Sequence, residues 1–138
     1  MTSMLPVVTV FVIALASSMM YFRRRSRKKL FGTREDANLE SLRTLSNTNA
    51  PLPLFEEVFR TLAKELGVLP GQLRTSDRLA DIFEVDSWQL GGAQDALEEL
   101  ILKRTIDRPP TLDTIQDLLT WLANEQSNTP TECRTTQN

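Results

Sequence analysis

An uncharged apolar segment near the N-terminus constrains this 138-residue chain more than any other feature. Residues 5–22 carry no charge and are rich in Val, Ile, Leu, Phe, Met and Ala. As a helix rising 1.5 Å per residue, the segment would span about 27 Å, close to the thickness of a bilayer's hydrocarbon core. We therefore predict a single transmembrane helix over 5–22, preceded by a short N-terminal tail of residues 1–4.

Six basic side chains follow this segment: Arg23, Arg24, Arg25, Arg27, Lys28 and Lys29. A cleavable signal peptide carries its positive charge before the apolar run, whereas residues 1–6 contain no Lys or Arg. The charge placement favours an anchor, although Ala14 and Ala16 have the spacing of a cleavage site. By the positive-inside rule, the N-terminus is expected outside and the chain after Arg23 in the cytoplasm, which makes a single-pass membrane protein.

The basic cluster at 23–29 also admits a nucleic-acid interpretation, because Lys and Arg neutralise phosphates without needing a fold. Directly after an apolar span, however, orientation and attraction to anionic headgroups explain the same charges. Each basic residue near such a surface contributes on the order of 1 kcal/mol. We therefore predict membrane lipid, and no nucleic acid, as the partner of this cluster.

The composition excludes several classes of enzyme. The chain has no His, so Ser-His-Asp or Cys-His catalysis and His-containing metal sites are ruled out. Its single Cys, Cys133, cannot form an intrachain disulfide. Only about 75 residues remain for a packed domain, which suits a carrier or binding module better than an enzyme. We predict no catalytic residue, no metal site and no enzymatic activity.

Two segments are predicted to lie outside the packed domain of residues 51–125. Residues 23–50 are interpreted as a basic juxtamembrane segment and linker, in which 36–45 can form a weak helix along the membrane. Residues 126–138 are rich in Thr, Asn, Gln and Ser, and such a segment buries too little apolar surface to offset its ordering entropy. It is predicted to be a disordered tail.

Charge separates the domain from the cluster that precedes it. Residues 51–124 carry 7 basic and 13 acidic side chains, a net charge of −6. An anionic membrane surface would repel this domain. We therefore expect residues 33–50 to act as a tether that holds it off the membrane.

Apolar positions within 51–125 follow a helical period. They recur in a single wide stripe from Leu54 to Leu66, which predicts a first helix ending at Gly67. Pro70 and Gly71 then force a turn. We expect a long loop from there to Asp86, held down by its own apolar side chains, namely Val68, Leu69, Leu73, Leu79, Ile82, Phe83 and Val85.

A second helix is predicted from Ser87 to about Lys103, with Asp86 as its N-cap. Its expected inward face comprises Trp88, Gly91, Ala96, Leu97, Leu100 and Ile101, and its outward face comprises Gln89, Asp95, Glu98 and Glu99. After Pro109 and Pro110, Thr111 or Asp113 can cap a last helix through about Asn124. No segment alternates at period two. The domain is predicted to be an all-α bundle of three main helices, with room for one further short helix.

Four short motifs in order carry a resemblance to a known family: Glu65-Leu66-Gly67-Val68, Asp86-Ser87-Trp88, Ala96-Leu97-Glu98-Glu99 and Thr114-Ile115-Gln116-Asp117-Leu118-Leu119. Over about residues 53–124 the segment resembles the acyl carrier proteins and their aminoacyl and peptidyl relatives. The interval from Leu66 to Ser87 is similar to the family's interval from its Leu-Gly-Val turn to the carrier serine.

The resemblance implies a role for Ser87 as the attachment point of a covalent 4′-phosphopantetheine arm that carries acyl groups as thioesters. Asp86 would cap the helix beside it. The implied partners are a phosphopantetheinyl transferase and acyl-transferring or synthase enzymes, whose basic patches would bind Asp95, Glu98 and Glu99. Trp88 stands where the family has Leu, and Gly91 and Gly92 replace larger residues, so we interpret the glycines as making room for the indole.

Two other interpretations remain open at this point. The carrier fold can have lost its prosthetic group and serve as a membrane-anchored protein-interaction adaptor, in which Asp86 and Ser87 are only a helix cap. The segment can also be an unrelated small helical bundle.

Overall fold

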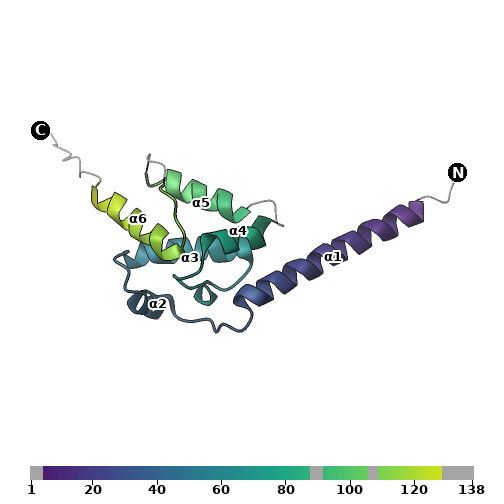
Figure 1. Ribbon diagram of the computed structural model, residues 1–138, viewed down its shortest axis with the longest axis horizontal. Helices are drawn as coiled ribbons and strands as arrows, with labels where there is room; N and C mark the ends of the chain where they lie inside the picture. Colours follow the sequence, from purple (N-terminus) through teal and green to yellow (C-terminus); the bar gives the residue numbers. More distant parts are fainter. Residues whose placement is uncertain (1–4, 88–91, 106–108, 129–138) are drawn as a thin grey trace, which may run out of the picture. The chain divides into compact units, whose positions relative to one another are not determined.

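The structure is a computed structural model that describes residues 5–87, 92–105 and 109–128 (Figure 1). Over these residues the chain forms six α-helices and one 3₁₀ helix: α1 (Leu5–Phe31), α2 (Leu39–Leu45), α3 (Leu52–Leu66), η1 (Pro70–Gln72), α4 (Leu79–Ser87), α5 (Gly92–Leu102) and α6 (Ile115–Asn128). The same residues contain no strand, only an isolated antiparallel bridge between Arg78 and Thr114. The prediction of an all-α protein is confirmed. The chain divides into two compact units after Arg34.

The first unit is the helix α1, which joins the apolar segment and the basic cluster without a break. It is the helix of the described chain that is long and apolar enough to cross a membrane. Its apolar side chains are not covered by protein: Val7 is 66% exposed and Met20 is 73% exposed. The helix continues beyond Phe22 to Phe31 because Arg and Lys are good helix formers, and Lys28 and Lys29 in its last turn favour the negative end of the dipole.

The second unit is built around α3. Seven residues of this helix are buried along one wide stripe: Leu54, Phe55, Val58, Phe59, Leu62, Ala63 and Leu66. The rings of Phe55 and Phe59, one turn apart, are stacked with their centroids 4.3 Å apart. The helices α2, α4, α5 and α6 and the turn η1 all contact α3 (Figure 1). The stripe that the sequence predicts is therefore the centre of the core.

The end of α3 is also as predicted. Gly67 adopts a left-handed conformation with φ of 64°, which a residue with a Cβ atom rarely takes. Its amide and that of Val68 donate to carbonyls of the last helical turn, Lys64 at 3.2 Å and Ala63 at 3.0 Å. These bonds satisfy main-chain acceptors that the end of a helix leaves free. The chain can therefore reverse into η1.

The long loop predicted up to Asp86 is wrong in its second half, because residues 79–87 form α4. Two of its apolar side chains, Leu79 and Ile82, are buried against the core, as is Leu73 before them. Helical spacing places Leu79 and Ile82 three residues apart on one face, and burial of that face stabilises a helix that is short by itself. Leu69, expected to anchor the loop, is instead 52% exposed.

Because residues 79–87 form α4, the predicted second helix does not begin at Ser87. Asp86 and Ser87 lie in the last turn of α4, and the next described helix, α5, begins at Gly92. Asp86 is therefore not the N-cap that the sequence predicts. Trp88, Gln89 and Gly91, assigned above to that helix, lie outside the described residues.

The helix α6 begins with a capping box. The Thr114 hydroxyl accepts from the Asp117 amide at 3.2 Å, and an Asp117 carboxylate oxygen accepts from the Thr114 amide at 3.0 Å. Neither Thr111 nor Asp113 is the cap, contrary to expectation. The Thr-x-x-Asp spacing is the sequence signal that identifies the true one. The helix also runs to Asn128, so residues 126–128, predicted as the start of a disordered tail, are exposed helix; there the Ser127 hydroxyl donates to the Ala123 carbonyl at 3.1 Å.

The loop before α4 holds the start of α6 in place. Carbonyls of Thr75 and Asp77 accept from the amides of Gln116 and Ile115 at 2.9 and 3.1 Å. Asp77 is buried, and its carboxylate accepts from the Arg74 amide at 2.8 Å. These bonds pair main-chain groups that would otherwise be unsatisfied at the start of the helix.

Residues 35–50 pack on the second unit and do not form the free tether that the sequence predicts. The Asp36 carboxylate accepts from the Gly71 amide at 3.0 Å, and the Ala37 amide donates to the Gly71 carbonyl at 3.1 Å. A Cβ atom on Gly71 would collide with the main chain of Ala37 and the side chain of Asp36. The absence of a side chain at Gly71 is therefore what lets residues 36 and 37 approach so closely.

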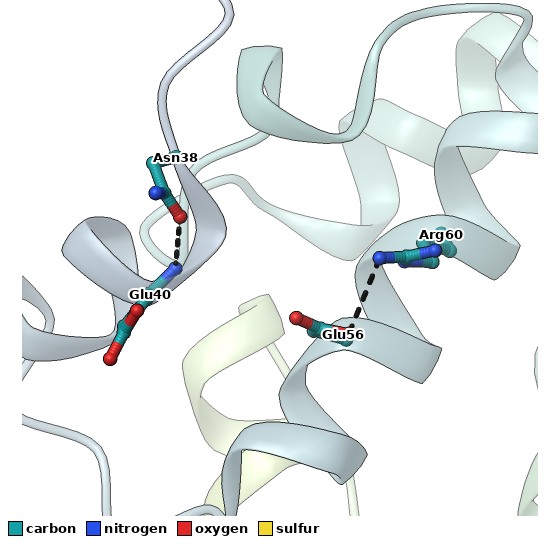
Figure 2. A network of polar contacts seen from close by, with 4 residues as sticks. All are labelled: Asn38, Glu40, Glu56 and Arg60. Atoms are coloured by element: carbon teal, nitrogen blue, oxygen red, sulfur yellow. Dashed lines mark hydrogen bonds and ion pairs between the residues drawn. The ribbon is translucent and has the colours of Figure 1, made fainter.

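The helix α2 follows this contact and is capped by Asn38, whose side-chain oxygen accepts from the Glu40 amide at 2.9 Å (Figure 2). Figure 2 also shows the exposed pair of Arg60 and Glu56, one turn apart on α3. At the far end of this segment, Arg43 donates to the carbonyl of the buried Ala50 at 2.7 Å. The segment is therefore part of the second unit, which begins at Glu35.

We predict that Asp36→Ala loosens residues 35–50, because it removes the acceptor of the Gly71 amide. The stability loss should be about 1 kcal/mol, and about 1–3 kcal/mol for the overpacked Gly71→Ala. Amide hydrogen exchange of Ala37 in the full chain measures the loosening directly. Glu35→Ala is the matched control, since it removes the same charge from a residue whose described contact is made by its main-chain carbonyl. Equal effects of Asp36→Ala and Glu35→Ala would contradict this account.

Candidate functional site

The residues predicted to carry function are divided between two helices that contact each other, α4 and α5. Ser87 is the last residue of α4, and Asp86 precedes it. Asp95, Glu98 and Glu99 lie on α5, which begins at Gly92. The side chains of Asp86 and Ser87 lie outside the described part of the chain, so the orientation of the Ser87 hydroxyl stays a prediction.

The acidic face of α5 is exposed, as its helical spacing predicts. Asp95, Glu98 and Glu99 all face solvent, while Ala93, Leu97, Leu100 and Ile101 of the same helix are buried. The burial of these four side chains fixes the rotation of the helix about its axis. The position of the acidic face therefore follows from core packing.

The three carboxylates of this face differ in their surroundings. Glu99 forms an ion pair of 2.8 Å with Lys103, one turn along the helix. Glu98 accepts a hydrogen bond of 3.1 Å from the side-chain amide of Gln94. No hydrogen bond or ion pair of the Asp95 side chain is formed with the described residues. The carboxylate of Asp95 is therefore available to a basic partner, whereas Lys103 already neutralises part of the charge of Glu99.

The ion pair shifts the pKa values of its two members in opposite directions, each in favour of the charged form. The hydrogen bond from Lys103 and then its positive charge lower the pKa of Glu99 below 4.5. The same contacts raise the pKa of Lys103 above 10.5. Because the pair is exposed, its contribution to stability is small.

A groove of about 260 Å³ runs between α3 and α5. Its lining residues are Glu57, Thr61, Lys64, Glu65, Ala96, Glu99, Leu100 and Lys103. Most of these side chains are polar and the charges have both signs. Such a groove does not suit the burial of an apolar acyl chain, because sites for apolar ligands are lined mainly by hydrophobic side chains.

Gly92, the first described residue of α5, lies beside Glu65, which lines this groove. A Cβ atom on Gly92 would lie 2.8 Å from a carboxylate oxygen of Glu65, so the glycine gives the Glu65 side chain room. The sequence predicts that the missing side chain at Gly92 makes space for the Trp88 indole, but the Glu65 side chain occupies that space. Gly91 and Trp88 lie outside the described residues.

Sequence reasoning missed two contacts that hold the end of α5 against α3 and α6. Arg104, just after α5, forms an ion pair with Glu57 of α3. Thr105 adds a hydrogen bond of 3.3 Å to Glu125 of α6. No local spacing in the sequence points to either pair, since the partners are far apart along the chain. Among the described residues, no group of three or more acidic or Cys side chains is placed to hold a metal ion.

The chain was compared with protein families, curated proteins and solved structures, and no family model, curated protein or solved structure matches it.

We predict that Lys103→Gln raises the pKa of Glu99 back toward 4.5, since it removes the hydrogen bond and the charge that lower it. The pair's contribution to stability is present above the unfolded pKa of Glu99 and is lost as the pH falls through the lower folded value. NMR titration of the Glu carboxyl carbons measures the shift. The control is Arg60→Gln, which breaks the similar pair with Glu56 and should leave Glu99 unaffected. An unchanged Glu99 titration in Lys103→Gln would contradict the assignment.

Proposed function

We propose that the protein is a membrane-tethered acyl-carrier-like protein, not itself an enzyme, whose Ser87 accepts a 4′-phosphopantetheine arm for thioester-bound acyl or related groups. The observation that carries the proposal is the exposed acidic face of α5, Asp95, Glu98 and Glu99, on the helix that follows Ser87 in an all-α unit. A transferase or synthase with a basic docking patch is complementary to such a face, and complementary charges speed encounter and set orientation.

The attachment step would require little of this chain. The Ser87 hydroxyl oxygen attacks the pantetheine-side phosphorus of coenzyme A, a phosphodiester bond forms, and the bond to the leaving adenosine bisphosphate breaks. The hydroxyl proton passes to a base of the transferase. This chain supplies the nucleophile and the docking surface, so it needs no catalytic base of its own.

The anchor is the second part of the proposal. The uncovered apolar side chains of α1 would be costly to expose to water, and a bilayer covers them. By the positive-inside rule, the basic residues that follow would keep the second unit in the cytoplasm. Because residues 35–50 pack on the second unit, the carrier would be confined near membrane-bound partners, which raises its effective concentration for them.

One observation favours a second candidate, an adaptor with the same fold and anchor but no prosthetic group. Ser87 lies in α4 more than two turns after its first residue, Leu79, whereas phosphate groups are favoured at helix N-termini. In the adaptor, the acidic face of α5 would bind basic partner proteins directly.

Intact mass decides between the two candidates. The full-length protein, solubilised in detergent, is incubated with coenzyme A and a broad-specificity phosphopantetheinyl transferase. We expect a mass gain of one phosphopantetheine group, none in Ser87→Ala, and an unchanged gain in Ser76→Ala, which alters an exposed serine of the loop before α4. No gain with several transferases would reject the carrier and favour the adaptor.

The orientation of the anchor is tested separately. A tag fused after Asn138 is expected to be inaccessible to antibody in intact cells and accessible after permeabilisation, because the six positive charges after Phe22 retain that side of the helix in the cytoplasm. A tag fused before Met1 is the control and should be readable without permeabilisation. The reverse pattern would overturn the cytoplasmic assignment.

A further inference from the structure

One face of α1 carries a hollow at the end of its apolar segment. The hollow has a volume of about 350 Å³ and is lined by Tyr21, Arg24, Arg25 and Lys28. Because α1 is continuous here, this spacing of three, four and seven residues brings the four side chains to one face. Arg27 and Lys29 of the same basic cluster do not line it.

The three basic side chains of the hollow are available for a ligand. Arg24, Arg25 and Lys28 are exposed and form no ion pair or side-chain hydrogen bond with the described residues. The residues of α1 include no Asp or Glu, so the helix itself offers no counter-ion. In the second unit, by contrast, Arg43 and Arg74 donate to main-chain carbonyls.

The position of the hollow along α1 matches the depth of lipid headgroups. Tyr21 lies at the end of the apolar segment, where interfacial aromatic residues gather in membrane helices. From Tyr21 to Lys28 the helix rises about 10 Å, enough to cross a headgroup layer of roughly 5–8 Å. The Tyr21 side chain can therefore reach the lipid phosphates from the hydrocarbon side of the headgroup layer, and the Lys28 side chain can reach them from the water side.

We propose that Tyr21, Arg24, Arg25 and Lys28 form a binding site for an anionic lipid whose headgroup ends in a phosphomonoester. This inference rests on the membrane-anchor part of the proposed function and is independent of the modification of Ser87. The guanidinium groups of Arg24 and Arg25 can each donate two hydrogen bonds to phosphate oxygens, and the Lys28 ammonium adds a point charge.

Charge matching selects the phosphomonoester over other anionic lipids. Three cationic side chains converge on one hollow with no acidic neighbour on the helix. A phosphomonoester carries about −1.5 to −2 charge at neutral pH and three terminal oxygens, whereas a phosphodiester headgroup offers one charge and two. The phosphomonoester is therefore expected to bind the same three side chains more tightly than a phosphodiester does.

The test uses the full-length protein in neutral detergent micelles. Native mass spectrometry measures the binding of short-chain phosphatidic acid, a phosphomonoester, and of short-chain phosphatidylglycerol, a phosphodiester, with inorganic phosphate as competitor. We expect phosphatidic acid to bind about tenfold more tightly than phosphatidylglycerol. An excess of inorganic phosphate should not displace it, because the lipid's acyl chains also contact the apolar part of α1.

Two triple variants remove equal charge from different faces of α1. Arg24→Gln, Arg25→Gln and Lys28→Gln together should abolish the preference for phosphatidic acid. Arg23→Gln, Arg27→Gln and Lys29→Gln together should retain it. Equal loss in both triples would show a general charge effect and overturn the site, as would equal affinity of the unaltered chain for the two lipids. Displacement by inorganic phosphate would overturn its assignment to a lipid.

Failure of the anchor is distinguished by a separate measurement. The unaltered protein is reconstituted with vesicles of phosphatidylcholine alone and floated on a density gradient at high salt. A protein that does not float with these neutral vesicles would refute the anchor and, with it, the lipid site. A protein that floats but shows no preference between the two anionic lipids would refute the site and leave the anchor standing.

Discussion

Burial of the apolar stripe of α3 is the interaction on which the rest of the second unit depends. Its seven buried side chains face α2, α4, α5, α6 and η1, so each of these elements is held by contact with one helix. Completely burying a side chain such as Leu54 or Phe55 contributes about 1.5–3 kcal/mol. Loss of α3 packing would therefore release every other element, including the acidic face of α5.

Main-chain hydrogen bonds decide where the chain segments around α3 are held. The bonds of Asp36 and Ala37 to Gly71 tie residues 35–50 to the second unit, and those of Thr75 and Asp77 hold the start of α6. The first set shortens the tether between the two units.

Much of the fold could be predicted from local pattern. Gly67 ends α3 because only a left-handed residue closes that turn, and the rotation of α5 follows from the spacing of Leu97, Leu100 and Ile101. The helix α4 was missed because its two buried residues, Leu79 and Ile82, give a stripe too short to distinguish from a packed loop. Of the candidate site, the exposed acidic residues and the i, i+4 pair of Glu99 with Lys103 follow from local spacing, whereas the pairing of Arg104 with Glu57 becomes visible only in the structure.

By itself, the sequence determined the elements whose causes are local: an apolar helix followed by basic residues, the wide stripe of α3, and the exposed face of Asp95, Glu98 and Glu99. Only the tertiary structure decided which distant groups meet. Asp36 reaches Gly71 across 35 residues, and Arg104 reaches Glu57 across 47. The physical reason is that a helix face is set by a repeat of a few residues, while a contact between segments depends on how the whole core packs.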